Sequence, residues 1–398
     1  MSAQGSGEAD VHLTFLPDTR RSLVAVQFVR RRKWWITGAL VVLLSPVVWS
    51  YASFLARPGT DGWRVRSVEW VRDHGGAGFV NATEHWWYSH HQPPKGGKPS
   101  SILTKPVAGK QAAASPGVAH LAPPPNLHPF VTPALPAEGV WHPAGRLVHG
   151  VPAMYVTALR PDAVHTSLAT GVAWLDPTLL RTVMYAGVQL PGGTWANQAP
   201  IPATLRAGLV AAFNSGFKLA DSRGGYFAEG KVVRPLAPGA ASFVIDDTGK
   251  PIVGQWGRDV DMGPHVASVR QNLALIVDNG APVPGLQDNT HGRWGFTLGN
   301  KLLVWRSGVG VTPSGALVFA AGNGLSAETL ANTLVNAGAS RAMELDINSE
   351  WTRFFIYDAP DPAHPEVVVG SKLVPDMRSS PTLYLEAETR DFFALFAR

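Results

Sequence analysis

Residues 304–351 read VWRSGVGVTPSGALVFAAGNGLSAETLANTLVNAGASRAMELDINSEW and combine two kinds of regular structure. Two apolar runs joined by a Pro-Ser-Gly turn predict neighbouring strands. The next segment, residues 326–337, predicts a helix, because Ser326 is a suitable N-cap and Gly338 is a typical helix stop. Residues 341–348 then predict a further strand. The stretch therefore indicates strands and a helix within one α+β domain.

Short apolar runs separated by glycine or proline turns continue from about Gly139 to the end of the chain. They show no internal repeat and, apart from a weaker pattern near residues 204–208, little further helix. The sequence predicts an α+β, strand-rich, mixed-sheet domain with few helices at residues 139–398, preceded by one transmembrane helix and a Pro-rich linker. Strands are expected at residues 152–160, 171–176, 181–188, 209–215, 241–247, 273–279, 301–307, 315–322, 341–348, 353–358 and 380–387.

A charge-free apolar segment at residues 34–56 predicts a transmembrane helix, since it is long enough to cross a hydrocarbon core of about 30 Å. Tryptophans near its ends are typical of interfacial anchors. The basic run from Arg30 to Lys33 precedes it, so the positive-inside rule places residues 1–33 in the cytoplasm. A cleaved signal peptide is the alternative, although the apolar run is longer than the core of a typical one. We expect a single-pass protein of the cell membrane with an extracytoplasmic C-terminal domain.

Residues 57–138 predict a juxtamembrane segment followed by a Pro/Ala/Gly-rich linker. The linker has little to bury, which is typical of an extended spacer. The chain has a formal net charge of +5 and no cysteine, so disulfides, thiolate metal sites and a cysteine nucleophile are excluded. It has no Lys/Arg stripe with interleaved aromatics, and nucleic acid is therefore not an expected partner.

Four motifs follow one another in the predicted domain: an early turn, an arginine entering a glycine-containing strand, a glycine before the helix, and a closing Leu-Asp. The residues that carry them are Asn214, Gly216, Phe217, Arg306, Gly310, Gly324, Leu345 and Asp346. In this order and spacing the chain resembles the phosphodiester glycosidase domain family over about residues 150–385. The resemblance implies a hydrolase that cleaves a sugar-1-phosphodiester or a related cell-envelope glycan, with a carbohydrate or sugar phosphate as substrate.

The closing motif departs from the family pattern. Glycines that would follow Asp346 are replaced by Ile-Asn-Ser-Glu-Trp at residues 347–351, so side chains take the place of a close backbone approach to a ligand. A non-catalytic glycan-binding or exopolysaccharide-assembly protein on the same fold is therefore the alternative function. A third possibility is hydrolysis of an ordinary glycosidic bond, with Glu344 and Glu350 as acid and base.

Cleavage at the anomeric carbon would expel a phosphate ester, which is a weak base with a second pKa of about 6. The site then needs a cation for the phosphate, and a carboxylate for the oxocarbenium-like centre or for water. We assign Arg306 to the first role and Asp346 to the second, with Glu344 as an alternative carboxylate on the same strand face. A buried salt bridge is the other meaning of Arg306.

The predicted substrate contacts come from scattered polar and aromatic residues. Asn214 and Asn348 can hydrogen-bond sugar hydroxyls, and Trp351 offers a ring face. Gly216 belongs to the family motif, and Asn323 lies in a Gly-Asn-Gly-Leu-Ser stretch whose backbone amides could bind an anion at the helix N-terminus. A tight turn for Asn214 and core packing for Trp351 are the alternatives.

Asp346, Asn348 and Glu350 spell the beginning of a calcium-binding loop, D-x-N-x-E. The pattern then fails, because Trp351 replaces the expected glycine and Tyr357 stands where the closing glutamate belongs. We expect no required cofactor, with a divalent cation such as Ca²⁺ as the alternative.

Overall fold

The chain divides into two compact units, Met1–Arg57 and Pro58–Arg398. The computed structural model describes residues 19–90, 93–99, 117–295 and 303–398 of the chain.

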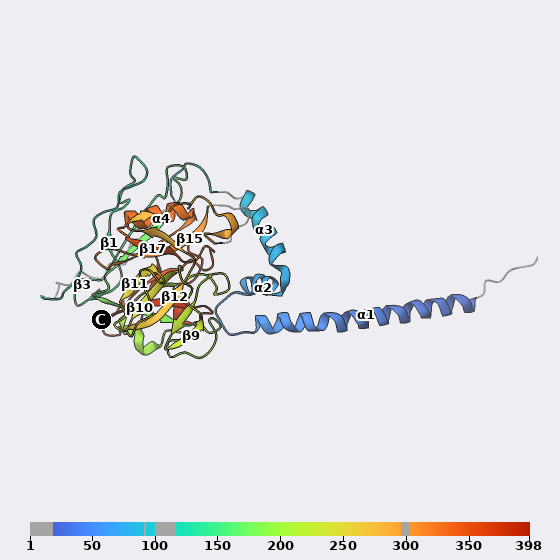
Figure 1. The fold of residues 1–398 in the computed structure, drawn as a ribbon. Coiled ribbons are helices and arrows are strands. Elements are labelled where there is room, and N and C mark those ends of the chain that lie inside the picture. The colour runs from blue at the N-terminus through green and yellow to red at the C-terminus, as the bar shows by residue number, and fades with distance from the viewer. Residues whose placement is uncertain (1–18, 91–92, 100–116, 296–302) are drawn as a thin grey trace, which may run out of the picture. The chain divides into compact units, whose positions relative to one another are not determined.

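The first unit contains one long helix, α1 (Thr19–Leu55), drawn in dark blue in Figure 1. Its part Thr37–Leu55, 19 residues long, is apolar enough to cross a membrane, and it overlaps the predicted segment 34–56. One such helix near the N-terminus is consistent with a single-pass anchor and with a signal sequence.

The second unit begins with two short helices, α2 (Trp63–Val71) and α3 (Ala77–His90). The segment between them, Arg72–Gly76, is kinked where Gly75 takes a φ of +85°. Neither α2 nor the kinked segment buries a residue. Apolar packing therefore contributes little to holding this part of the chain in place.

Three sheets form most of the second unit (Figure 1). The largest has eight strands in the order β1-β4-β5-β16-β15-β17-β13-β14. These are β1 (His142–Pro143), β4 (Met154–Leu159), β5 (Thr170–Leu175), β16 (Leu317–Leu325), β15 (Val304–Val311), β17 (Arg341–Glu344), β13 (Leu275–Asp278) and β14 (Ala281–Pro282).

The other two large sheets have five strands each, and β2 (Leu147–Val148) pairs with β3 (Val151–Pro152) alone. One contains, in order, β11 (Pro251–Gln255), β10 (Ala241–Asp246), β12 (Val266–Gln271), β8 (Tyr226–Ala228) and β9 (Lys231–Arg234). The other contains β19 (Val369–Lys372), β18 (Phe354–Asp358), β7 (Leu209–Asn214), β20 (Phe392–Ala397) and β6 (Leu180–Tyr185). Short 3₁₀ turns lie at Ala203–Gly208, Thr290–Gly292 and Leu383–Leu385.

The glycines of β15 allow the helix α4 (Ala327–Asn336) to lie close to the sheet (Figure 1). A Cβ atom at Gly308 would stand 3.0 Å from a methyl of Leu334 and 3.1 Å from one of Leu330. Every residue of β15 is buried, because α4 covers one face and the core lies on the other. The chain runs from β16 through α4 into β17, so the two neighbours of β15 are joined across it.

The core lies where the sheets meet and is centred on Phe213 of β7. Its ring centroid lies 5.3 Å from that of Phe319, 5.4 Å from that of Phe393, 5.8 Å from that of Phe354 and 6.3 Å from that of Phe243. These rings come from strands of all three sheets. Aromatic packing of this kind fixes the strand ends, and so the loops that follow them, relative to one another.

The prediction of a strand-rich α+β domain with few helices is confirmed. The helix expected at residues 326–337 is α4, and the Ser326 hydroxyl accepts a hydrogen bond from the Thr329 amide at 3.0 Å, as a capping residue should. The described strand ladders are all antiparallel, however, rather than mixed as expected. Around β15 this arrangement arises because α4 carries the chain past β15 before it re-enters the sheet, so that β16 and β17 both run antiparallel to β15.

Two details at the C-terminus differ from prediction. Residues 380–387 were expected to form a strand but contain the short turn Leu383–Leu385. The last strand is instead β20, which the sequence pattern did not reveal. Its FFALFA run is buried on both faces and so lacks the alternation that marks a strand with one solvent face.

Part of the predicted linker packs against the domain. Leu127 is buried, and Glu138 forms a buried ion pair with Arg160 at 2.8 Å. Arg160 also donates to the carbonyl oxygens of Val131 and Pro133. Residues 100–116 of the linker lie outside the described residues.

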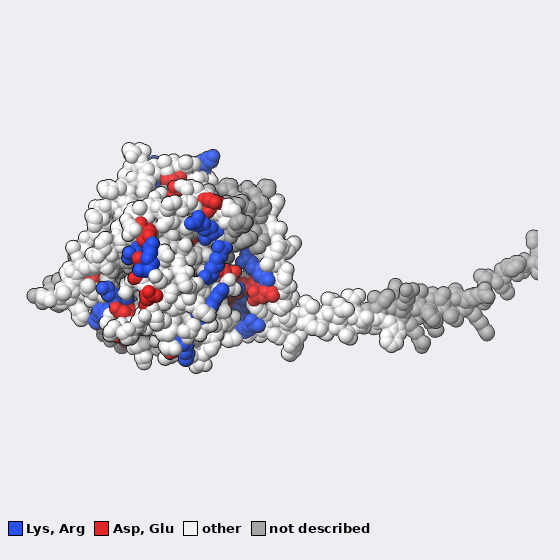
Figure 2. Space-filling model, in the orientation of Figure 1, with Lys and Arg blue, Asp and Glu red and all other residues white. Residues whose placement is uncertain are grey.

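On the face drawn in Figure 2, acidic and basic side chains of the second unit lie next to one another. Among the ion pairs of this unit, Arg258 pairs with Asp259 at 2.6 Å and with Asp278 at 2.8 Å. Such exposed pairs contribute little to stability individually, because water screens them.

Candidate functional site

Arg306 and Glu344 meet in the interior of the large sheet. The two side chains form an ion pair, and both residues are 0% exposed. The Arg306 guanidinium also donates to the carbonyl oxygens of Leu325 and Trp294, at 3.0 and 2.9 Å. Burial raises the pKa of Glu344, and Arg306 acts against that rise. The ion pair therefore links β15 to β17, and Arg306 points away from solvent.

The strand predicted at residues 341–348 stops at Glu344, so Asp346 and Asn348 lie in the loop that follows β17. Asp346 is tied to β15 through Ser307, whose amide donates to the Asp346 carbonyl at 2.9 Å. The Asn348 amide donates to the Asp346 carboxylate at 2.9 Å. The loop therefore turns back on itself and does not continue the strand alternation.

The carboxyl group of Asp346 is buried and has a raised pKa. The residue is only 2% exposed, and burial raises its pKa to about 6, although Arg390 and backbone amides act in the opposite direction. The Arg390 guanidinium lies 3.4 Å from its Oδ2 atom. A carboxyl group with a pKa near neutrality beside a cation is typical of a reactive site.

Asn214, at the end of β7, is brought close to Asp346 by Ser307. Its side-chain amide donates to the Ser307 hydroxyl at 3.2 Å, and that hydroxyl donates to the Asp346 carbonyl at 3.1 Å. The side-chain oxygen of Asn214 accepts from the Arg353 amide at 3.1 Å. Asn214 thus links the end of β7 to β15 and to the residue before β18, and both of its polar side-chain atoms already have partners.

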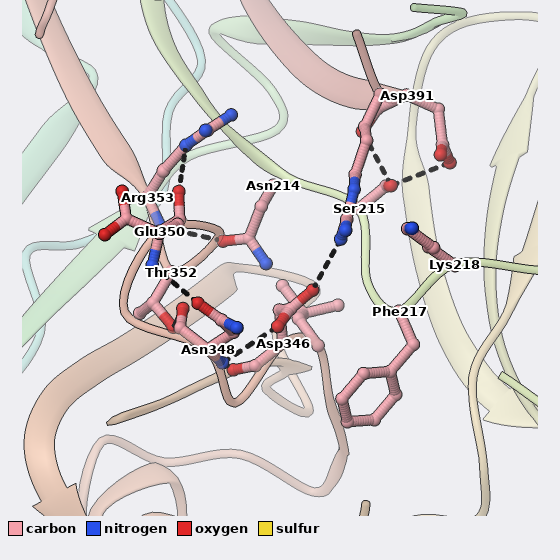
Figure 3. A network of polar contacts seen from close by, with 12 residues as sticks. Asn214, Ser215, Phe217, Lys218, Asp346, Asn348, Glu350, Thr352, Arg353 and Asp391 are labelled. Atoms are coloured by element: carbon pink, nitrogen blue, oxygen red, sulfur yellow. Dashed lines mark hydrogen bonds and ion pairs between the residues drawn. The ribbon is translucent and has the colours of Figure 1, made fainter. Parts of the chain in front are cut away.

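Asp391 stabilises the turn after Asn214 through Ser215 (Figure 3). The Ser215 hydroxyl donates to the Asp391 carboxylate at 2.7 Å, and the same carboxylate accepts from the buried Arg270 at 2.7 Å. Gly216 takes a φ of +142°, and a Cβ there would stand 3.3 Å from the Asn272 side chain. Figure 3 shows the Asp346 carboxylate directed toward this turn.

Trp351 packs against two guanidinium groups. Arg390 lies 3.5 Å from its ring centroid and Arg353 lies 4.5 Å from it. The residue is 5% exposed, so both cation–π contacts are largely desolvated. Trp351 therefore orients Arg390 against Asp346 and offers no open ring face in this conformation.

The remaining predicted residues lie at the margin of this group. Asn348 accepts a hydrogen bond from the Glu350 amide at 2.9 Å and shapes the loop. Asn323 is exposed near the end of β16, one strand beyond β15 from the Asp346 loop. Among the described residues, no group of three or more His, Asp or Glu side chains is arranged to hold a metal ion.

Three residues around Asp346 and the Asn214 turn were not predicted from the sequence. Ser307, Arg390 and Asp391 lie next to residues that were singled out, or next to a strand that was not predicted. Ser307 follows Arg306 directly, while Arg390 and Asp391 immediately precede β20. A prediction of β20 would have placed the polar residues just before it close to Asn214, because β20 pairs with β7.

Comparison with known proteins shows a family resemblance in the middle of the chain. Residues 203–349, which include Asn214, Ser307 and Asp346, match the family model described as phosphodiester glycosidase. This part of the chain is similar to phosphodiester glycosidase domains. The similarity supports a glycosidase-type hydrolytic function. Arg390 lies outside the matched range.

Two solved structures show distant similarity to this chain. The zebrafish N-acetylglucosamine-1-phosphodiester alpha-N-acetylglucosaminidase catalytic domain, described as auto-inhibited by its pro-peptide, is 15% identical with a TM-score of 0.39; the match covers 62% of this chain and 82% of that one. A hypothetical protein from Synechocystis is 11% identical with a TM-score of 0.35, covering 65% and 64%. No curated protein matches the sequence.

Proposed function

We propose that the protein is a membrane-anchored, extracytoplasmic glycosidase that hydrolyses a sugar-1-phosphodiester or a related cell-envelope glycan. The observation that supports it best is the pairing of Asp346 with Arg390 beside the Asn214 turn, within and next to the matched family range. A carboxylate and a guanidinium this close supply the two charges that the reaction needs.

In this proposal Asp346 acts as the ionised carboxylate. It stabilises positive charge at the anomeric carbon or activates the water that attacks it. The bond between that carbon and the phosphate oxygen breaks, its electron pair leaves with the phosphate monoester, and water supplies the new oxygen. Arg390 takes the anion-facing role first given to Arg306, because Arg306 is fully buried among Glu344 and backbone carbonyls.

The membrane anchor in this proposal is α1, whose segment Thr37–Leu55 is long and apolar enough to cross a bilayer. The basic run at residues 30–33 supports a cytoplasmic N-terminus and an extracytoplasmic domain. Fractionation of cells followed by protease treatment of intact spheroplasts tests this. Digestion of the domain in intact spheroplasts is expected, and protection of the domain would contradict it.

We further propose that the reaction needs no metal ion. The oxygens of Asp346 and Asn348 that a calcium loop would use accept hydrogen bonds from nearby backbone amides. Activity should survive treatment with EDTA, and restoration of a lost activity by Ca²⁺ would show the opposite.

Turnover tests the main proposal. The full-length protein in detergent is incubated with sugar-1-phosphodiesters, and release of reducing sugar is measured. Asp346→Asn should abolish release, whereas Asp361→Asn, an acid-to-amide change at an exposed position, should leave it unchanged. The melting temperature of Asp346→Asn should stay within a few degrees of wild type, because the amide keeps the shape of the carboxyl group.

A non-catalytic glycan-binding protein is the second candidate. It is favoured by the nearly complete burial of Asp346 and by the replacement of the family glycines at residues 347–351. Binding of sugar phosphates or envelope glycans without release of reducing sugar, in wild type and Asp361→Asn alike, would favour this candidate over the enzyme.

A further inference from the structure

Neighbouring groups cover the Asp346 side chain. The carboxyl group is 2% exposed, so a substrate reaches it only after a neighbouring group moves. Arg390 lies directly against it and is itself pinned by Trp351 on one side. On its other side Arg390 contacts Glu69 of α2, at 2.8 Å.

Glu69 bridges two cations with one oxygen atom. Its Oε1 lies 2.8 Å from Nη2 of Arg390 and 2.9 Å from Nζ of Lys218. The other terminal nitrogen of Arg390, Nη1, faces Asp346. The Arg390 guanidinium therefore lies between the Asp346 and Glu69 carboxylates and contacts both.

We propose that Lys218 and Arg390 form the subsite for the substrate's phosphate group, and that Glu69 of α2 occupies this subsite in the resting protein. The substrate's phosphate and Glu69 of α2 then compete for the same two cations. This inference rests on the proposed function, since it places the phosphate of a sugar-1-phosphodiester at the reacting centre.

The chemistry of the two anions is matched. A phosphodiester carries one negative charge over two non-bridging oxygens, as a carboxylate does over its two. A lysine and an arginine fork are the cations that bind such oxygens most often. Because Arg390 faces Asp346 as well, a phosphate in place of Glu69 lies beside the carboxylate that acts on the anomeric carbon. The bond that breaks joins this phosphate to the anomeric carbon.

Glu69 carries the negative charge that an occupant of the phosphate subsite needs. Burial alone would raise the pKa of Glu69, but Arg390 and Lys218 outweigh it, and the pKa lies below its ordinary value. The side chain is therefore ionised at neutral pH, and α2 presents a fixed negative charge to the two cations.

The segment that carries Glu69 is suited to release, since α2 buries no residue. Just before α2, the Thr389 hydroxyl donates to the Asp61 carboxylate at 2.7 Å, and the Thr60 hydroxyl donates to the Glu388 carboxylate at 3.2 Å. Elements with little buried apolar surface open locally at low free-energy cost. Departure of α2 would therefore leave the core of the domain intact.

The experiment compares Glu69→Gln with the wild type and with Glu366→Gln, a matched change at an exposed glutamate. Binding of inorganic phosphate to the full-length protein in detergent is measured by titration calorimetry. Glu69→Gln should bind phosphate about tenfold more tightly, because the competing charge is gone. Adding Lys218→Gln to Glu69→Gln should remove that gain.

A second measurement detects the helix itself. In the wild type, saturating phosphate should speed backbone hydrogen exchange at residues 63–71, since phosphate displaces α2. A purely structural ion pair predicts no such change, and melting temperatures of the variants show whether they fold. The inference is overturned if Glu69→Gln folds and binds phosphate no better than wild type, or if the gain persists without Lys218.

Turnover separates this inference from the proposed function. If Glu69→Gln gains phosphate affinity and also shows a lower KM for sugar-1-phosphodiesters, both stand. If it gains phosphate affinity but releases no sugar, the subsite stands and the proposed reaction falls.

Discussion

Ser307 and Asp346 are joined by three hydrogen bonds. The Ser307 amide donates to the Asp346 carbonyl at 2.9 Å, its hydroxyl meets the same oxygen at 3.1 Å, and the Asp346 amide lies 3.2 Å from that hydroxyl. The first bond extends the β15–β17 ladder beyond the last residue of β17. Ser307 therefore fixes where the Asp346 loop begins, and its hydroxyl also carries the link to Asn214.

Ser307→Ala should lower kcat and leave KM nearly unchanged. The change leaves buried groups of Asn214 and Asp346 without their partner, at a cost of about 1–3 kcal/mol, which corresponds to a loss of roughly tenfold or more if it acts on Asp346 placement. Steady-state kinetics measure this. Ser314→Ala, in an exposed turn, is the control. Unchanged kcat in a folded Ser307→Ala protein would contradict the role.

Activity should depend on the ionisation of Asp346. Because its pKa is raised to about 6, kcat/KM should rise with pH and reach half its maximum near that value if the carboxylate form is active. A profile that falls through the same range would assign Asp346 the role of an acid instead.

The free energy of unfolding should also depend on the ionisation of Asp346, but it should fall with pH where activity rises. The folded protein keeps a proton that the unfolded chain, with an ordinary pKa of about 3.9, has lost. The contribution of Asp346 to the free energy of unfolding therefore falls as pH rises from about 4 to about 6. Melting curves of wild type and Asp346→Asn over this range check the prediction, since the difference between them should change in the variant's favour.

Breaking the Arg306–Glu344 pair should destabilise the fold rather than the reaction alone. Arg306→Met leaves a buried carboxylate without its cation, which costs about 3–5 kcal/mol. The double variant Arg306→Met with Glu344→Leu should recover much of that loss. Denaturant unfolding measures both. If the single variant is as stable as wild type and only activity is lost, Arg306 belongs to the reacting group after all.

Gly308→Val should separate α4 from the sheet. The new side chain would meet Leu334, Leu330 and the Met343 carbonyl, all within 3.1 Å of its Cβ, and overpacking of this kind costs about 1–3 kcal/mol. Gly263→Ala, where nothing lies within 4 Å, should be nearly neutral. Equal melting temperatures for the two variants would contradict the close approach.

The sequence predicted the fold where local signals and burial agree. The cap at Ser326, the stop at Gly338 and the apolar face of α4 are all local, and the helix was placed within about a residue at each end. β20 was missed because a strand buried on both faces has no alternation to detect. The antiparallel order of the sheets depends on contacts between distant parts of the chain, which single-sequence patterns do not contain.

For the site, the sequence identified residues but not their partners. Asn214 and Asp346 were singled out, and Ser307 brings them together. Arg306 was a reasonable phosphate ligand by residue type, yet its orientation is set by the buried Glu344 one strand away. The cation beside Asp346 comes from the far end of the chain, and only the folding of β20 next to β7 brings Arg390 there.

The buried pair of Glu138 and Arg160 has a consequence for where a shortened chain can begin. A chain that begins after Glu138 would leave the enclosed Arg160 guanidinium without its carboxylate. A chain that begins between Leu127 and Glu138 would keep that pair but expose the apolar surface that Leu127 covers. A recombinant version of the second unit should therefore begin before Leu127.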